Sequence, residues 1–196
     1  PASAIAGFEA KLRANTQQRD AANYGLALGY LKAGKHAEAR KILAALIVKK
    51  PFELAFQHSN IELDIAVEDY DGALLKLDRL LLQNPDNYPL TRLKSEALWQ
   101  AHRYEESGQV LTGLSRKRSQ DPMIWYRLAE VRGLAGNISG VHQARAEYFI
   151  LVGGFDMARE QLTLAAKLVV ADFTRSAIIR QRLRDVVAME DRLRKL

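Results

Sequence analysis

A period of 34 residues runs through much of the chain. Positions one period apart carry the same or a similar residue type: Pro51 and Pro85; Leu43 and Leu77; Ala39, Ala73 and Ser107. Periods of about 20–50 residues are typical of stacked repeats, in which each unit buries its apolar face against its neighbours. One such unit cannot fold alone, so the period predicts a stack of similar units with a groove along it.

Each unit has the pattern of a helical hairpin. From Asn23 to Pro51 an apolar-periodic segment, a break at Gly34, a second apolar-periodic segment and a closing proline follow one another. Glycine permits the tight turn, and the residue before a proline avoids helical geometry. A small residue, a bulky one four positions later and a terminal proline within 34 residues are the tetratricopeptide signature. The sequence therefore predicts an all-α tetratricopeptide-repeat superhelix, an α-solenoid of about eleven helices without strands.

We expect residues 1–196 to form one domain of this kind. The predicted segments are a leading helix (1–20), repeat 1 (21–53), repeat 2 (54–87), repeat 3 (88–121), repeat 4 with an overlapping half-repeat (122–168), and a C-terminal capping helix (172–196). Capping elements with a polar outer face are usual at the ends of repeat stacks.

The period slips near the C-terminus. Gly153 follows Gly136 by 17 residues, which is half a period. We therefore expect the helix at 141–152 to be the second helix of one hairpin and the first helix of the next. Asp172 is a suitable N-cap for the last helix, which is predicted to reach Leu196.

Composition adds few constraints. The formal net charge is +6 and there is no cysteine, so the chain has no disulfide framework and no thiolate chemistry. No apolar run approaches the ~18 residues of a transmembrane helix. The basic residues at 116–118 and in the last helix have only Phe173 nearby, whereas single-stranded nucleic acid binding favours interleaved aromatics. We expect no nucleic acid partner. Because the chain begins with Pro1 and not Met, a signal peptide could lie ahead of it.

Catalytic motifs are absent from the sequence. It contains no HExxH, no glycine-rich phosphate loop, no Cys/His zinc spacing and no GxSxG. His58 and Glu62 lie four residues apart on a predicted helix, but two ligands without a third make a poor metal site. The chain itself is therefore predicted to be neither an enzyme nor a metal-binding protein, and to need no cofactor.

In a tetratricopeptide stack the first helix of each hairpin lines the groove, at repeat positions 5 and 9. Position 5 falls on Tyr24, His58, Arg92, Tyr126 and, in the shifted hairpin, Gln143. Position 9 falls on Leu28, Glu62, Glu96, Glu130 and Glu147. Two further aromatic residues stand at helical spacing: Trp99 is predicted to face the groove, and Trp125 to lie in the core.

Four glutamates in register would form an acidic ladder in an otherwise basic protein. One interpretation is a groove that holds an extended or helical polypeptide through polar and aromatic contacts. The other is that glutamate is simply a good helix former on a solvated face. The ladder does not suit the tetratricopeptide domains that clamp a C-terminal carboxylate. Those domains need Lys at position 5 and Asn at position 9. In this chain Arg92 is the only cationic residue at position 5, and the glutamates at position 9 would repel a carboxylate.

Several segments resemble one family. GVHQARAEYFILVGGFDMAREQLTLAAKL (140–168), YGLALGYLKAG (24–34), DNYPL (86–90) and the closing DF…RQRLRDV (172–186) are similar to the C-terminal tetratricopeptide region of periplasmic zinc metalloproteases. The family is typified by the beta-barrel assembly-enhancing protease. The resemblance covers nearly the whole chain, and GVHQARAEYF at the half-period slip is its most specific part.

The resemblance implies a periplasmic protein-binding tail. Its partners would be outer-membrane assembly components, substrate proteins or the parent's own protease domain. Zinc is expected in that protease domain, which this chain lacks, so no catalytic or metal residue is carried over. Two alternatives from other classes remain open, namely a free-standing cytoplasmic scaffold and an RNA-binding helical repeat.

Overall fold

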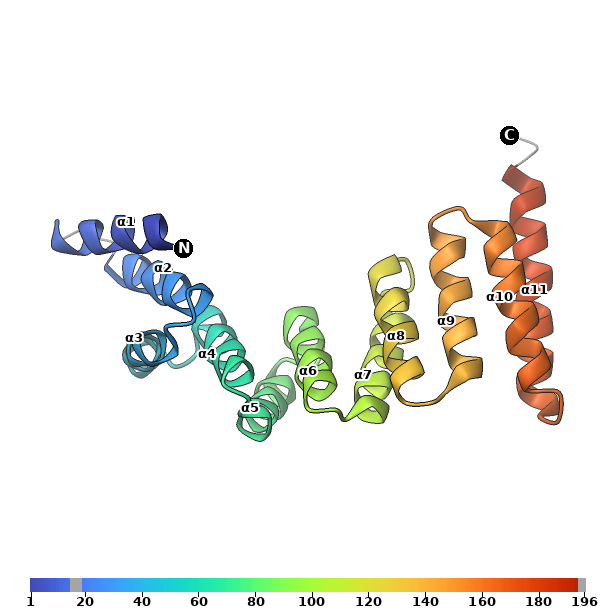
Figure 1. The fold of residues 1–196 in the computed structure, drawn as a ribbon, viewed down its shortest axis with the longest axis horizontal. Helices are drawn as coiled ribbons and strands as arrows, with labels where there is room; N and C mark the ends of the chain where they lie inside the picture. The colour runs from blue at the N-terminus through green and yellow to red at the C-terminus, as the bar shows by residue number, and fades with distance from the viewer. Residues whose placement is uncertain (15–18, 194–196) are drawn as a thin grey trace. The chain divides into compact units, whose positions relative to one another are not determined.

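The computed structural model describes residues 1–14 and 19–193, and these are all helix, turn and loop (Figure 1). The helices are α1 (Ala2–Arg13), α2 (Arg19–Lys32), α3 (His36–Lys49), α4 (Leu54–Ala66), α5 (Tyr70–Gln83), α6 (Tyr88–Gln100), α7 (Tyr104–Lys117), α8 (Pro122–Leu134), α9 (Ile138–Leu151), α10 (Phe155–Leu168) and α11 (Phe173–Leu193). The predicted all-α fold is confirmed. The predicted helix end at Leu196 lies outside the described residues.

The chain divides into two compact units, Pro1–Leu93 and Lys94–Leu196. In the first unit the buried cluster of Ala27, Ala39, Leu43 and Leu63 joins α2, α3 and α4. α1 packs on α2, where the Tyr30 hydroxyl donates a hydrogen bond to Glu9 at 3.0 Å.

The second unit has its own core, between α9, α10 and α11. Its buried residues are Ala146, Ala158, Leu162, Ala165, Val169, Ile179 and Val186. Ser107, which stands where the period has alanine, is also fully buried. Its hydroxyl donates to the Ser95 carbonyl at 2.8 Å, so the extra polar atom is satisfied inside the core.

Tight turns between helices share one backbone geometry. Each contains one residue with positive φ: Gly34 (71°), Glu68 (63°), His102 (59°), Gly136 (74°) and Gly153 (80°). In each, the next residue's N–H bonds the carbonyl five residues earlier: Lys35 to Tyr30 (2.9 Å), Asp69 to Asp64, Arg103 to Leu98, Asn137 to Arg132 and Gly154 to Phe149 (all 2.8 Å). This is the Schellman closure of a helix C-terminus.

A second, wider turn precedes α4, α6, α8 and α11. There the N–H of the residue ahead of the helix bonds the carbonyl three residues earlier: Glu53 to Lys50 (3.2 Å), Asn87 to Asn84 (3.1 Å), Asp121 to Arg118 (3.1 Å) and Asp172 to Val169 (2.9 Å). The two turns alternate until α9, which has a tight turn at both ends. A wide turn then leads from α10 into α11. Wide turns elsewhere connect the second helix of one hairpin to the first helix of the next, so α11 is placed like the first helix of a further hairpin.

The N-cap predicted at Asp172 is confirmed. Its Oδ1 accepts a hydrogen bond of 2.9 Å from the Arg175 backbone N–H. Asp121 caps α8 in the same way through the N–H of Met123, at 3.0 Å. A carboxylate at this place satisfies an otherwise unpaired N–H and suits the positive end of the helix dipole.

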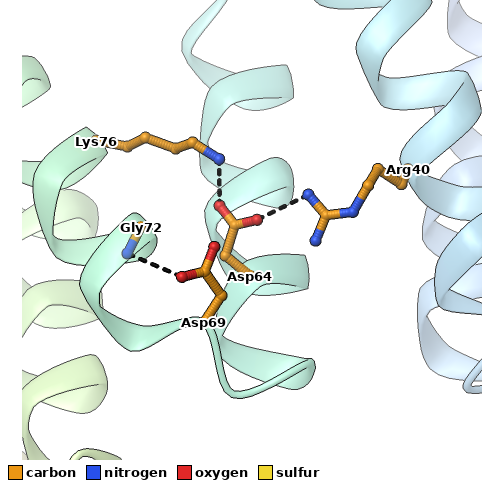
Figure 2. Close-up of polar contacts among 5 residues, drawn as sticks. All are labelled: Arg40, Asp64, Asp69, Gly72 and Lys76. Carbon is orange, nitrogen blue, oxygen red and sulfur yellow. Dashed lines mark hydrogen bonds and ion pairs between the residues drawn. The ribbon is translucent and has the colours of Figure 1, made fainter.

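A buried carboxylate joins three helices of the first unit (Figure 2). Asp64 of α4 has no exposed side-chain surface. Its Oδ1 accepts from Arg40 Nη1 of α3 at 2.9 Å, and its Oδ2 pairs with Lys76 Nζ of α5. Close by, Asp69 Oδ1 caps α5 through the Gly72 N–H at 3.1 Å. Both flanking second helices are thus attached to α4 through one side chain.

The tight turns predict opposite effects at equivalent positions. A non-glycine residue in the left-handed region costs about 1–2 kcal/mol, so Glu68→Gly is expected to stabilise the protein by up to about 1 kcal/mol after the extra chain entropy of glycine. Gly136→Ala is expected to destabilise it by a similar amount. Urea unfolding midpoints check both, with Glu68→Ala as a control that removes the carboxylate but keeps the strain. Equal midpoints for Glu68→Gly and Glu68→Ala would contradict the prediction.

The triad at Asp64 predicts an asymmetric response to mutation. Arg40 and Lys76 are 44% and 36% exposed, so they stay hydrated when the carboxylate is removed, whereas Asp64 is 0% exposed. Asp64→Asn is expected to cost about 1–3 kcal/mol of unfolding free energy. Arg40→Gln with Lys76→Gln leaves a buried charge unpaired and is expected to cost about 3–5 kcal/mol. The reverse order in urea unfolding would show that the triad does not act as described.

Candidate functional site

The predicted groove positions of the first unit are partly used for packing. The Tyr24 hydroxyl of α2 donates to the Ala55 carbonyl at 3.1 Å and lies 2.9 Å from the Ser59 hydroxyl. Its ring packs on Phe56, with centroids 5.1 Å apart. Leu28, one turn further along α2, is half-buried. Tyr24 therefore fixes α2 to α4 and presents only part of its ring.

His58 and Glu62 lie one turn apart on α4. Their closest atoms, His58 Nδ1 and Glu62 Oε2, are 3.5 Å apart. The hydrogen bond from His58 is the main reason that the pKa of Glu62 lies below its ordinary value, against partial burial, which raises it; the charge of Arg92 adds to the lowering. Arg92 is exposed on α6. Within residues 1–14 and 19–193 no three His, Cys, Asp or Glu side chains group as metal ligands.

In the second unit one arginine gathers three of the predicted residues. Arg127 of α8 lies 3.1 Å from Glu130 and 3.8 Å from Glu96 of α6. Its guanidinium also lies over the Trp99 ring, 5.5 Å from the centroid. Glu96 accepts a further hydrogen bond from Gln100, at 3.0 Å. We call these four residues, Glu96, Trp99, Arg127 and Glu130, the Arg127 cluster. Arg127 was not predicted, although it directly follows groove position 5.

Tyr126 and Gln143 lie near this cluster in sequence but make other contacts. Tyr126 is 45% exposed, and its ring lies 5.8 Å from that of Tyr148 on α9. Gln143 Nε2 donates to the Ser139 hydroxyl of the same helix, at 3.2 Å. An aromatic pair and an amide are thus both accessible beside α9.

Glu147 of α9 is bound to Arg182 of α11. Arg182 Nε donates to Glu147 Oε1 at 2.7 Å and Nη2 donates to Oε2, so the pair is bidentate. The hydrogen bond with Glu147 is the main cause that raises the pKa of Arg182. From the sequence the last helix was predicted to be a capping helix, and no contact between Arg182 and Glu147 was predicted.

The glutamates of the predicted acidic ladder are not free carboxylates, because each has a partner side chain. His58 faces Glu62, Arg127 is shared by Glu96 and Glu130, and Arg182 holds Glu147. Within each unit each glutamate at position 9 has a cationic or hydrogen-bond-donating partner. These residues offer paired charges and aromatic surface, not a row of bare carboxylates.

Two hollows flank the bridge between Glu147 and Arg182. One, of about 480 Å³, is also lined by Leu162, Ile178 and Ile179; the other, of about 610 Å³, is lined by Ile150, Leu151, Phe155, Met189 and Leu193. Trp125, Glu147 and Arg182 line both. α9, α10 and α11 lie side by side in Figure 1, and we call the surface between α8, α9 and α11 the α11 groove.

Trp125 does not lie in the core, so that prediction was wrong. Its side chain is only partly buried, and its Nε1 donates to the Ser119 carbonyl at 2.9 Å. This hydrogen bond holds the indole at the edge of both hollows. Its apolar ring is therefore part of the α11 groove.

Comparison with known proteins agrees with this architecture. The Tetratricopeptide repeat family model matches residues 64–131. A tetratricopeptide repeat protein from Parabacteroides merdae ATCC 43184 superposes with a TM-score of 0.59 at 14% identity, covering 93% of this chain and 76% of that chain. MamA from Desulfovibrio magneticus RS-1 also gives 0.59 at 14% identity, covering 89% and 96%. The fold is a tetratricopeptide solenoid.

The amino-acid sequence also resembles one group of proteases over most of its length. It is 29% identical over 159 residues to the beta-barrel assembly-enhancing protease of Escherichia coli (strain K12), covering 80% of this chain and 32% of that protein. The protein of that name from Yersinia pestis is 24% identical over 183 residues, covering 93% and 38%. The resemblance predicted from sequence segments is confirmed. The chain spans about a third of the length of these relatives.

The pair on α4 predicts a pKa change that can be measured. Because the hydrogen bond from His58 lowers the pKa of Glu62, His58→Ala is expected to raise that pKa toward its ordinary value. A depressed folded-state pKa contributes stability above the unfolded value of about 4.3, and this is lost as pH falls through the folded pKa. Carboxyl NMR titration of wild type and variant measures the shift, and Glu62→Gln identifies the resonance. An unchanged pKa would contradict the assignment.

Proposed function

We propose that this chain is a protein-binding module, the tetratricopeptide tail of a periplasmic zinc metalloprotease that acts in outer-membrane protein assembly and quality control. The observation that carries the proposal is the α11 groove, a hollowed and partly apolar surface on a tetratricopeptide fold. Its likeness to proteins named beta-barrel assembly-enhancing protease supports the protease assignment.

The proposal assigns recognition to this chain and hydrolysis to another part of the parent protein. The chain carries no HExxH, and the matched segment covers only 32% of the Escherichia coli relative. Zinc and the catalytic residues would lie in the protease domain of the parent. Repeat stacks of this kind bind partners over an extended surface built from successive helices.

Two surfaces of the second unit suit polypeptide partners. The Arg127 cluster combines an indole, a guanidinium and two carboxylates, which are residue types enriched where proteins meet. The α11 groove adds apolar lining residues on both sides of the ion pair between Glu147 and Arg182. Outer-membrane assembly components, substrate proteins and the parent's own protease domain are the candidate occupants.

The Arg127 cluster predicts a charge-dependent capture of the partner. Glu96→Lys with Glu130→Lys is expected to reduce capture by about ten-fold, because both the surface charge and the pairs with Arg127 are reversed. Capture is measured as photo-crosslinking from a probe at Trp99 in the full-length protein in cells. Unchanged crosslinking by the doubly reversed protein would discard the Arg127 cluster as a binding surface.

Two controls separate recognition from folding. Adding Arg127→Glu to the double variant restores the internal ion pairs with opposite signs. If this triple variant regains capture, the pairs only support the fold; if capture stays low, the surface itself recognises the partner. Glu38→Lys with Glu160→Lys changes the net charge equally on exposed second-helix positions and is expected to leave capture unchanged.

The protease assignment has its own test. The natural reading frame that contains this chain is expected to encode a signal peptide and a helix with HExxH ahead of Pro1. Cell fractionation of the natural protein is expected to place it in the periplasm. A frame that opens within a few codons of Pro1 would refute the assignment and leave a free-standing scaffold.

A further inference from the structure

Arg132 of α8 is a half-buried cation with neutral partners. Its Nη1 donates to the Gly140 carbonyl at 3.1 Å and its Nη2 to the Thr112 hydroxyl at 3.3 Å. Burial lowers the pKa of Arg132, and no neighbouring charge raises it. In the part of the chain that the structure describes, Arg132 has no ion pair with a carboxylate.

The local packing holds this guanidinium in place. A Cβ at Gly140 would lie 2.8 Å from Arg132 Cδ, so a larger residue at this position would displace the arginine side chain. These two hydrogen bonds engage two of the five N–H donors of a guanidinium. The remaining donors can form the bidentate pair with a carboxylate that arginine favours.

Arg132 lines three hollows, and one of them, of about 450 Å³, also has Glu105 and Arg116 in its lining. Arg116 and Arg132 line the 480 Å³ hollow, and Arg175 lines the adjoining one with Arg132. Arg175 pairs with Asp172 at 3.3 Å, outside the hollows. The carboxylates that face the groove already have partners.

Those two carboxylates are Glu147 and Asp185. Glu147 is held by Arg182, and Asp185 accepts a hydrogen bond from Gln181 at 2.8 Å. This end of the α11 groove thus has more arginines than carboxylates. Within the described residues Arg132 itself has no carboxylate partner, and a bound polypeptide can supply one.

The α11 groove runs along α9 through adjoining hollows. The hollow beside Asn137 and Ser139 shares Arg132, Gln143 and Ile178 with the 480 Å³ hollow. That hollow in turn shares Trp125, Glu147 and Arg182 with the apolar 610 Å³ one. One end is therefore cationic and the other apolar, and a chain can continue past Arg132 in either direction.

The spacing between the two ends sets the length of the occupant. Gly140, which contacts Arg132, and Ile150, which lines the apolar end, are ten residues apart on α9. At 1.5 Å per residue the ends lie about 15 Å apart. An extended chain covers that distance in about four or five residues.

We infer that the α11 groove binds an extended internal segment of a partner polypeptide, with an Asp or Glu carboxylate on Arg132 and a large apolar side chain in the 610 Å³ hollow beside Ile150. The inference rests on the proposed protein-binding function and adds the chemistry of the bound segment. The acidic and apolar residues are spaced about four or five residues apart. This arrangement differs from a C-terminal carboxylate clamp at repeat positions 5 and 9.

The test measures binding of defined peptides by fluorescence anisotropy. The probes are acetylated and amidated, with Asp and Phe separated by roughly two to five Ser or Ala residues. The best-spaced probe is expected to bind wild-type protein about ten-fold more tightly than its Asn counterpart. Arg132→Gln is expected to abolish that preference.

Arg145→Gln is the matched control, because Arg145 is exposed on the same α9 and lines none of the hollows described above. It is expected to keep the preference for Asp. Arg132→Lys keeps the charge without the planar fork and is expected to retain part of it. Urea unfolding of each variant shows whether it is folded.

Three results would overturn the inference. They are equal binding of the Asp and Asn probes to wild type, an Asp preference that survives in Arg132→Gln, and tighter binding of an Asn probe that ends in a free carboxylate. The proposed function fails separately, if probes at Trp99 and Trp125 crosslink no polypeptide in the full-length protein. Retained crosslinking without an Asp preference would leave that function standing and refute this inference alone.

Discussion

The tight turn between helices is the constraint on which the rest of the architecture depends. One left-handed residue and one hydrogen bond to the carbonyl five residues earlier fix how each helix leaves the one before it. The turn recurs every 34 residues and then once after 17, so α9 is bounded by the same turn at both ends. Because a wide turn then leads into α11, that helix reaches α9 through Arg182, and a groove forms where a simple cap was expected.

Buried polar groups in this fold lie at the contacts between helices. Asp64 attaches α3 and α5 to α4, and the Ser107 hydroxyl is satisfied by a carbonyl of α6. Apolar packing alone tolerates sliding of one helix along another, whereas a carboxylate with two cations favours one register. Buried ion pairs seldom add net stability over an apolar core, so such a triad is better understood as specifying the arrangement.

The helices and most turns were readable from the sequence because they depend on local signals. Gly34, Gly136 and Gly153 mark tight turns directly. Glu68 and His102 adopt the same conformation without a glycine signal and are recognised only through the period. The candidate groove positions were assigned from the period, which says nothing of their side-chain partners. Arg127 and Arg182 reach Glu96 and Glu147 from other helices, and no spacing rule within one helix predicts such pairs.

These unpredicted partners determine which charged side chains are free to bind a ligand. Arginines already pair with the position-9 glutamates of the second unit, so a ligand that binds those glutamates must first displace an internal ion pair. Arg132 requires no such displacement, because its hydrogen-bond partners are a carbonyl and a hydroxyl. A partially desolvated cation gains more from an incoming carboxylate than an exposed one, since the effective dielectric constant is lower. The half-period slip that brings α11 against α9 therefore also creates the site best suited to an acidic residue.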